Sequence, residues 1–145
     1  MIAIDRPIYL DANILIYAME TDGDGGMLAR RWLLWVDRGK VRAVTSEITL
    51  AEVLPHPIAA GNLTLVEGYK RLLVTGPNLK VLPVSRQVLL RAAEIRADLK
   101  GETPDSIHVA TALVEGCGGF LTNDERLRLP TGLVRYSLVD VMDFY

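Results

Sequence analysis

The sequence predicts an α/β fold in which helices flank a central, mainly parallel sheet. Short apolar runs typical of strands alternate with helical patterns along the chain, and no repeat or long linker separates them. Strands that alternate with helices within one domain form parallel sheets, because each helix returns the chain to the same edge. The chain has 145 residues, a length that suits one domain with its own core. We therefore expect a single domain over residues 1–145.

Runs of aliphatic and β-branched residues place the strands. The first run, PIYLDA, covers residues 7–12 and leads into a turn. Turn-forming residues stand next to most of the other runs, as expected where a strand begins or ends. The further strands are expected at residues 40–45, 79–84, 118–122 and 132–137.

Apolar side chains at intervals of three and four residues predict helices between the strands. For example, Val88, Ala92 and Ile95 fall on one face of an expected helix whose other face is polar. Glycine or proline follows most of these patterns and stops them. The helices are expected at residues 27–39, 46–54, 62–76, 85–101 and 103–116, with residues 54–61 (LPHPIAAG) as a rigid connector.

Composition sets the class of protein. Lysine and arginine total 16 and aspartate and glutamate 18, so the formal net charge of −2 indicates neither a nucleic-acid binder nor a membrane-surface protein. Cys117 is the single cysteine, which excludes an internal disulfide and a cysteine-based zinc site and suits a reducing cytoplasm. No signal peptide is visible, and no apolar run approaches the roughly 18 residues that span a bilayer. We expect a cytoplasmic protein without a membrane segment.

Four acids follow strands or lie on helices near strand ends. Asp11 ends the first strand pattern, and Asp124 comes two residues after the strand at 118–122. Asp105 lies in the first turn of the last expected helix, and Glu52 lies on the apolar helix after the second strand. Parallel strands present their carboxyl ends at one rim, where four carboxylates would repel one another unless cations bound between them. Oxygen ligands without histidine or cysteine favour Mg²⁺ or Mn²⁺ over zinc.

Each acid also has an ordinary structural explanation. An acid in the first turn of a helix, such as Asp105, interacts with the helix dipole. An acid after a strand, such as Asp11 or Asp124, commonly forms a turn or a cap. Glu52 could lie on a partly exposed helix face. His108, which lies three residues after Asp105 and about 300° around the helix, is expected to be a packing residue rather than a catalytic one.

Four segments, YLDANILIY, SEITLAEVL, TPDSIHVATAL and FLTNDERL, in this order and at these spacings, resemble the PIN-domain family of metal-dependent ribonucleases. Within that family they look most like the VapC-type toxins of toxin–antitoxin pairs. No single segment is specific, but the combination is, and it covers the chain from Ile8 to the last expected strand. The resemblance implies a PIN-like α/β/α sandwich.

The resemblance also implies a site. A divalent ion, Mg²⁺ or Mn²⁺, would assist the hydrolysis of RNA phosphodiester bonds, with one or two ions bound. Glu52 would ligate directly or through water, and Glu125 leaves open which of two adjacent carboxylates coordinates. The matching positions are Asp11, Glu52, Asp105 and Asp124, here called the acidic quartet, for catalysis and metal binding, with Asn13 and Thr122 as the polar residues that support them.

Resemblance to the toxins implies RNA as substrate and a small antitoxin protein as partner. The antitoxin would insert a segment across the active-site groove, and residues 54–61 with an adjacent apolar stripe are a candidate docking surface. Core packing is the alternative for the stripe, which consists of Leu65, Val66, Tyr69, Leu72 and Leu73. A basic cluster that could contact phosphates, or simply be solvated, consists of Arg30, Arg31, Arg38, Lys40 and Arg42.

The chain is expected to form a homodimer. The resemblance implies pairing, because PIN domains commonly form dimers. The expected helices also carry large aromatic side chains that could form an interface, namely Trp32, Trp35 and Tyr69. A large exposed apolar patch usually marks an interface, and two-fold pairing would bury one patch against its copy. A monomer whose stripes all face the core or the antitoxin is the alternative.

Three other functions remain open. One is a housekeeping PIN-domain nuclease without an antitoxin. A second is a phosphotransfer or phosphatase-like α/β domain with Asp11 as phosphoryl acceptor, although LDANILIY lacks the acid or threonine two residues later that such phosphatases show. The third is a non-catalytic PIN-like binding module, which the presence of all four acids disfavours.

Overall fold

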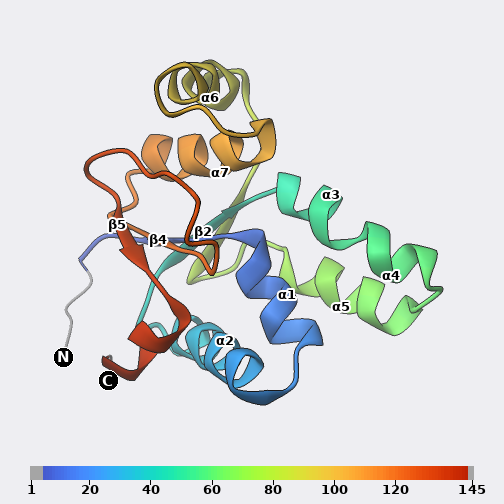
Figure 1. Ribbon diagram of the computed structural model, residues 1–145. Helices are drawn as coiled ribbons and strands as arrows, with labels where there is room; N and C mark the ends of the chain where they lie inside the picture. The colour runs from blue at the N-terminus through green and yellow to red at the C-terminus, as the bar shows by residue number, and fades with distance from the viewer. Residues whose placement is uncertain (1–4, 144–145) are drawn as a thin grey trace.

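A five-stranded sheet lies between two layers of helices in the computed structural model, which describes residues 5–143 (Figure 1). The strand order is β3-β2-β1-β4-β5, and every neighbouring pair is parallel. The prediction of a mainly parallel α/β sandwich is therefore confirmed. The strands are β1 (Ile8–Leu10), β2 (Ala43–Ser46), β3 (Leu79–Leu82), β4 (Gly119–Leu121) and β5 (Val134–Tyr136).

The helices cover both faces of this sheet. In Figure 1, α6 and α7 lie on one side, α1 and α2 lie on the other, and α3 to α5 extend beyond the end of β2. None of the helices described between residues 5 and 143 has both the length and the apolar character needed to cross a bilayer. Their bounds are α1 (Ala12–Glu20), α2 (Gly23–Asp37), α3 (Ile48–Val53), α4 (Pro55–Ala59), α5 (Leu63–Leu72), α6 (Arg86–Leu99), α7 (Thr103–Val114) and the 3₁₀ helix η1 (Leu138–Asp143).

The sheet separates two apolar cores. Tyr9 and Phe120 stack on each other and pack towards α6 and α7. Leu10 and Leu121 point the other way and pack with α1, α2 and α5. Every residue of β1, β2 and β4 is buried, as expected for strands covered on both faces. The pairing of Leu10 with Leu121 places the carboxyl ends of β1 and β4 side by side.

Local structure departs from the sequence prediction after β1 and at residues 54–61, among other places. The turn expected after β1 is a helix, because Asp11 caps it by accepting a hydrogen bond from the Ala12 amide. The connector expected at 54–61 contains the helix α4, whose first residue Pro55 suits a position where no amide hydrogen is needed. The helix α7 begins at Thr103, directly after its cap residue Glu102, as the expected range 103–116 indicated.

The apolar stripe and two of the aromatic residues expected to face partners belong to the core, whereas most of residues 54–61 are exposed. Trp32 and Tyr69 are fully buried, and the Trp32 indole donates a hydrogen bond to the Leu138 carbonyl. Val66 and Leu73 of the candidate docking stripe are buried as well. The sequence identified these apolar faces correctly but not what covers them, so the expectation that Trp32 and Tyr69 supply an exposed dimer surface is wrong.

Candidate metal-binding active site

Asp11 lies where β1 ends, beside the end of β4. It is 7% exposed and accepts three hydrogen bonds: from the Ala12 amide at 2.9 Å, from the Asn13 side-chain amide at 3.2 Å and from the Thr122 hydroxyl at 2.7 Å. Burial raises the pKa of Asp11, while His108 and the hydrogen bond from Thr122 oppose that rise. The carboxylate is therefore held in one orientation at the rim of the sheet.

Asn13 and Thr122 also connect Asp11 to the loop after β4. The Asn13 side chain donates to the Thr122 hydroxyl at 3.3 Å and accepts from the Asn123 amide at 3.1 Å. The same Thr122 hydroxyl accepts the Asp124 amide at 3.0 Å. Asn13 and Thr122 thus fix the backbone that leads to Asp124 as well as the Asp11 carboxylate.

Asp105 lies in the first turn of α7 and is half-buried. Within residues 5–143 its carboxylate has no hydrogen bond and no ion pair. Burial raises the pKa of Asp105, the negative charges of Asp11 and Asp124 raise it further, and His108 acts in the opposite direction. A carboxylate that is partly desolvated, unpaired and adjacent to other carboxylates is stabilised by a cation placed between them.

Asp124 accepts the Arg126 amide at 3.0 Å and forms an ion pair with the Arg126 side chain at 3.7 Å. Its own carbonyl accepts a hydrogen bond from Arg135 at 2.9 Å. Asp124 and Asp105 line the same cleft, whereas Glu125 is exposed and does not line it. The geometry therefore favours Asp124 over Glu125 as the acid that belongs to the site.

Glu52 reaches the site from α3 and forms a hydrogen bond with Nε2 of His108. His108 is 1% exposed, and its Nδ1 lies 2.5 Å from the Tyr9 hydroxyl. Burial raises the pKa of Tyr9 well above its usual value, so this hydroxyl stays protonated and donates to Nδ1. His108 is a buried residue, as expected, but the sequence analysis missed its bond to Glu52. The signal was a histidine in an apolar helix, since both ring nitrogens need partners when buried.

The acidic quartet converges on one rim without forming a closed set of ligands. Glu52 and Asp105 both interact electrostatically with Asp11, and Asp105 also interacts with Asp124. In the described part of the chain, no three histidine, cysteine, aspartate or glutamate side chains are arranged to hold a metal as they stand. The donor set fits Mg²⁺ or Mn²⁺, because Mg²⁺ keeps several waters and needs only one or two carboxylates directly. The assignment of the quartet as ligands stays a prediction.

Comparison with known proteins decides the family. The PIN domain model matches residues 8–132, which is most of the chain. The chain belongs to the PIN-domain family. No curated protein sequence matches it.

Solved structures share the architecture of this PIN domain. A toxin–antitoxin complex from Klebsiella pneumoniae has a TM-score of 0.65 and 21% identity, over 88% of this chain and 95% of that one. VapBC2 from Rickettsia felis, bound to a DNA fragment from its promoter, has a TM-score of 0.65 and 19% identity, over 90% and 97%. Mycobacterium tuberculosis VapC20, a sarcin–ricin loop cleaving toxin, has a TM-score of 0.65 and 16% identity, over 83% and 92%. At such identities the likeness establishes the fold.

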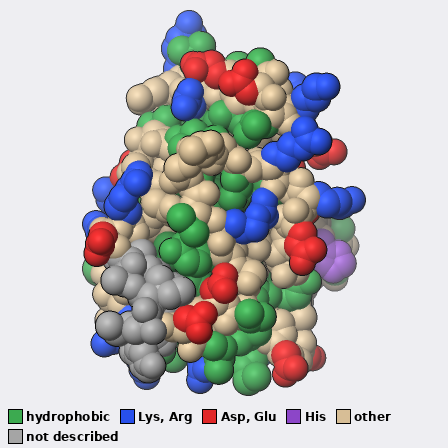
Figure 2. Space-filling model, turned by 60° about the vertical axis from the view of Figure 1, so that its left-hand side comes forward, with side chains coloured by type: hydrophobic (Ala, Val, Ile, Leu, Met, Phe, Trp, Pro, Cys, Tyr) green, Lys and Arg blue, Asp and Glu red, His purple; other side chains and the backbone are tan. Residues whose placement is uncertain are grey.

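The basic residues near the site of this PIN domain are not the ones that the sequence analysis selected. Residues 38–42 of the expected cluster join α2 to β2 at the amino ends of the strands, opposite the rim with the acids. Lys100, Arg126 and Arg128 instead line the cleft that also contains Asp105 and Asp124. Figure 2 shows basic side chains around the upper part of this face, where α6 lies, with hydrophobic side chains visible between them.

Proposed function

We propose that this PIN domain is a metal-dependent endoribonuclease and the toxin of a toxin–antitoxin pair. The observation that carries the proposal is Asp105, a half-buried carboxylate without a partner in the described chain, next to Asp11 and Asp124. Such a carboxylate destabilises the fold unless a cation binds it. The toxin–antitoxin complexes among the structural neighbours support the biological context.

Each residue of the site has a role in this proposal. Asp11, Asp105 and Asp124 would hold Mg²⁺ or Mn²⁺, and Glu52 would ligate directly or through water. The bound ion would lower the pKa of a water and offset the charge that develops on the phosphate. Thr122 and Asn13 hold Asp11 in place, and His108 holds Glu52 where it can orient the attacking water. One of the solved neighbours is itself an RNA-cleaving toxin.

An antitoxin would cover the groove at the acidic quartet, and two such domains would pair as a homodimer. Ile58 and Leu63, which are 59% and 72% exposed on α4 and α5, are apolar side chains available to a protein partner. The single PIN domain would act in the cytoplasm, which fits a buried cysteine without a disulfide.

RNA cleavage by purified protein tests the activity. We expect cleavage of structured RNA with Mn²⁺ or Mg²⁺, none with a chelator, and none for Asp105→Asn with either ion. Asp98→Asn is the matched control, because Asp98 is exposed on α6 and does not line the cleft. Cleavage by Asp105→Asn at the wild-type rate would contradict the site. Failure of wild type to cleave RNA under any of these conditions would contradict the nuclease.

Two further measurements test the partners. Co-expression with the neighbouring open reading frame should yield a small protein that co-purifies, and expression alone should harm cells. If neither occurs, a housekeeping nuclease is the better interpretation. Light scattering of the isolated protein should give twice the chain mass, and a value near 16.0 kDa that is unchanged on concentration would contradict the dimer.

A further inference from the structure

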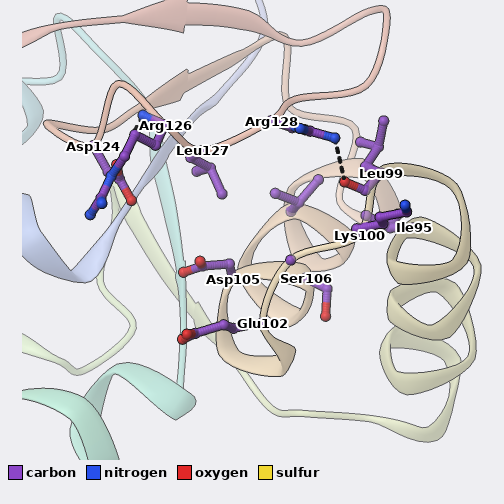
Figure 3. Close-up of a pocket in the computed structure, with 12 residues that line it drawn as sticks. Ile95, Leu99, Lys100, Glu102, Asp105, Ser106, Asp124, Arg126, Leu127 and Arg128 are labelled. Atoms are coloured by element: carbon purple, nitrogen blue, oxygen red, sulfur yellow. Dashed lines mark hydrogen bonds and ion pairs between the residues drawn. The ribbon is translucent and has the colours of Figure 1, made fainter.

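A cleft of about 460 Å³ begins at Asp105 and Asp124, two members of the acidic quartet, and continues away from them between α6, α7 and the loop after β4. Figure 3 shows Asp105 and Asp124 at one end and Ile95 and Leu99 at the other. The volume lies within the range of sites that hold small molecules. The cleft is thus a continuation of the candidate active site and not a separate cavity.

The far part of the cleft is apolar. Ile95 and Val109 form its floor and are nearly completely buried, and Leu99 and Leu127 are half-exposed at its walls. The Ser106 hydroxyl is already used, because it donates to the Thr103 carbonyl at 2.8 Å. These walls suit a flat, largely apolar surface such as the face of a nucleobase.

The edge of the cleft is cationic. Arg126 is 96% exposed, and Arg128 reaches the Leu99 carbonyl at 3.4 Å, so both guanidinium groups lie at the opening. Lys100 follows α6 with a φ of 59° and lies on the same edge. An acidic end, an apolar wall and a basic edge match one nucleotide unit of a polyanionic chain, whose charge the basic edge would offset.

We infer that this cleft binds the ribonucleotide next to the scissile phosphate. Its base would pack between Leu99 and Leu127, and its outer phosphate would contact Lys100 and Arg128. The inference rests on the proposed function, because that function places the scissile phosphate at the acidic quartet. A segment of a protein partner is the competing occupant, and binding and cleavage measurements separate the two.

Two variants alter the cleft without touching the quartet. Leu127→Trp fills the apolar part from the loop and leaves no void behind. Lys100→Gly removes a cation at a position where the positive φ favours glycine, so the backbone is not strained. Arg91→Ala is the control for charge, because Arg91 lies on α6, pairs with Glu94 and does not line the cleft.

The first experiment measures binding without catalysis. The four ribonucleoside 5′-monophosphates are titrated onto the full, metal-free chain and followed by amide NMR. We expect saturable shifts at residues 99–101 and 127–128, with affinity lowered by Leu127→Trp, whose indole would occupy the space of the base, and lowered by Lys100→Gly, but unchanged by Arg91→Ala. Shifts that are absent there, or that Leu127→Trp leaves intact, would overturn the inference.

The second experiment places the nucleotide relative to the cut. Oligoribonucleotides with one abasic residue at successive positions are cleaved by wild type and by Leu127→Trp. We expect kcat/KM of wild type to fall about tenfold at one position beside the cut, and Leu127→Trp to show no further loss at that position. Equal losses in both proteins, or no sensitive position, would overturn the subsite while leaving the nuclease intact.

Two other outcomes separate failure of the proposed nuclease activity from occupation of the cleft by a protein segment. If the nucleotides bind in the cleft but no RNA is cleaved, the proposed function fails and the cleft stands as a nucleotide site. If Leu127→Trp cleaves RNA like wild type and loses a co-purifying protein, the occupant is a protein segment and the inference is wrong.

Discussion

Asp105→Asn should stabilise the metal-free protein and reduce the further stabilisation that Mn²⁺ provides. The Asp105 carboxylate is half-buried, has no partner in the described chain, and has its pKa raised first by burial and then by Asp11 and Asp124. Asparagine has nearly the same shape but no charge, so it removes the desolvation cost and the repulsion together. Because the carboxylate is only half-buried, solvent screens these interactions, and pairs of solvent-accessible charges contribute about 0.2–1 kcal/mol. We expect a gain on the order of 1 kcal/mol, or roughly 3 °C in melting temperature for a chain of this size.

The assay is calorimetry with a chelator and with Mn²⁺. At a Mn²⁺ concentration of 100 times its dissociation constant, binding stabilises the wild type by about 2.7 kcal/mol. The Asp105→Asn protein should gain clearly less, so that the order of the two melting temperatures reverses when Mn²⁺ is added. Asp98→Asn, on the exposed face of α6, should follow the wild type in both conditions.

The pH dependence of the metal-free protein gives an independent check. An acid with a raised pKa binds its proton more tightly in the folded state than in the unfolded state. Wild-type stability should therefore fall as pH rises from the ordinary carboxyl pKa, about 4, through the raised pKa of Asp105. Asp105→Asn should flatten this part of the curve. The reasoning would be refuted if Asp105→Asn were less stable than wild type without metal and if Mn²⁺ left the melting temperature of the wild type unchanged.

Three further predictions concern residues around the site and the core. Thr122→Val removes the hydroxyl that donates to Asp11, and we expect Mn²⁺ affinity to fall about tenfold or more by titration, with little change if Thr122 only packs. Cys117 is 1% exposed and burial raises its pKa to about 12, so it should resist thiol reagents at pH 8 until the protein unfolds; rapid labelling of native protein would contradict this. Gly119→Ala would place a Cβ 2.3 Å from the Tyr136 ring, and should cost about 1–3 kcal/mol in urea unfolding, whereas an unchanged midpoint would show that the ring moves freely.

The sequence predicted the rim of the site better than its surroundings. Asp11 and Asp124 follow strands, and the rule that parallel strands end at one edge was enough to bring them together. The cations of the adjoining cleft were not predictable from clustering in the sequence, because Lys100 and Arg128 come from separate segments that meet only after folding. The apolar stripe containing Tyr69 showed which face is apolar, but the pattern carries no information on which element covers it.

Glu52 illustrates the same limit for a polar group. Its place on an apolar helix indicated a constraint, but the partner that supplies it, His108, comes from a helix far along the chain. Tyr9 completes the contact from β1, where it packs within the core and stacks on Phe120 with ring centroids 5.0 Å apart. Buried polar groups of this kind are found by asking where each nitrogen and oxygen is satisfied, which needs the three-dimensional arrangement.

Tyr9→Phe tests whether this contact positions Glu52 for the proposed reaction. The substitution keeps the ring and its stacking on Phe120 but removes the hydroxyl that donates to His108 Nδ1. A buried nitrogen left without its partner costs about 1–3 kcal/mol, so stability should fall. With the histidine no longer fixed, we expect kcat for RNA cleavage to fall about tenfold and KM to stay constant, because Glu52 would act on the attacking water and not on RNA binding.

Tyr69→Phe is the matched control for that experiment. Tyr69 is also fully buried, and its hydroxyl donates to Glu20, a residue outside the acidic quartet. Both variants should therefore lose stability, while only Tyr9→Phe should lose kcat. The Tyr9→Phe effect should also vanish in a Glu52→Gln background, since a residue that acts through Glu52 has nothing left to position there. Equal losses of stability with unchanged kcat in both tyrosine variants would show that Tyr9 and His108 only fill the core.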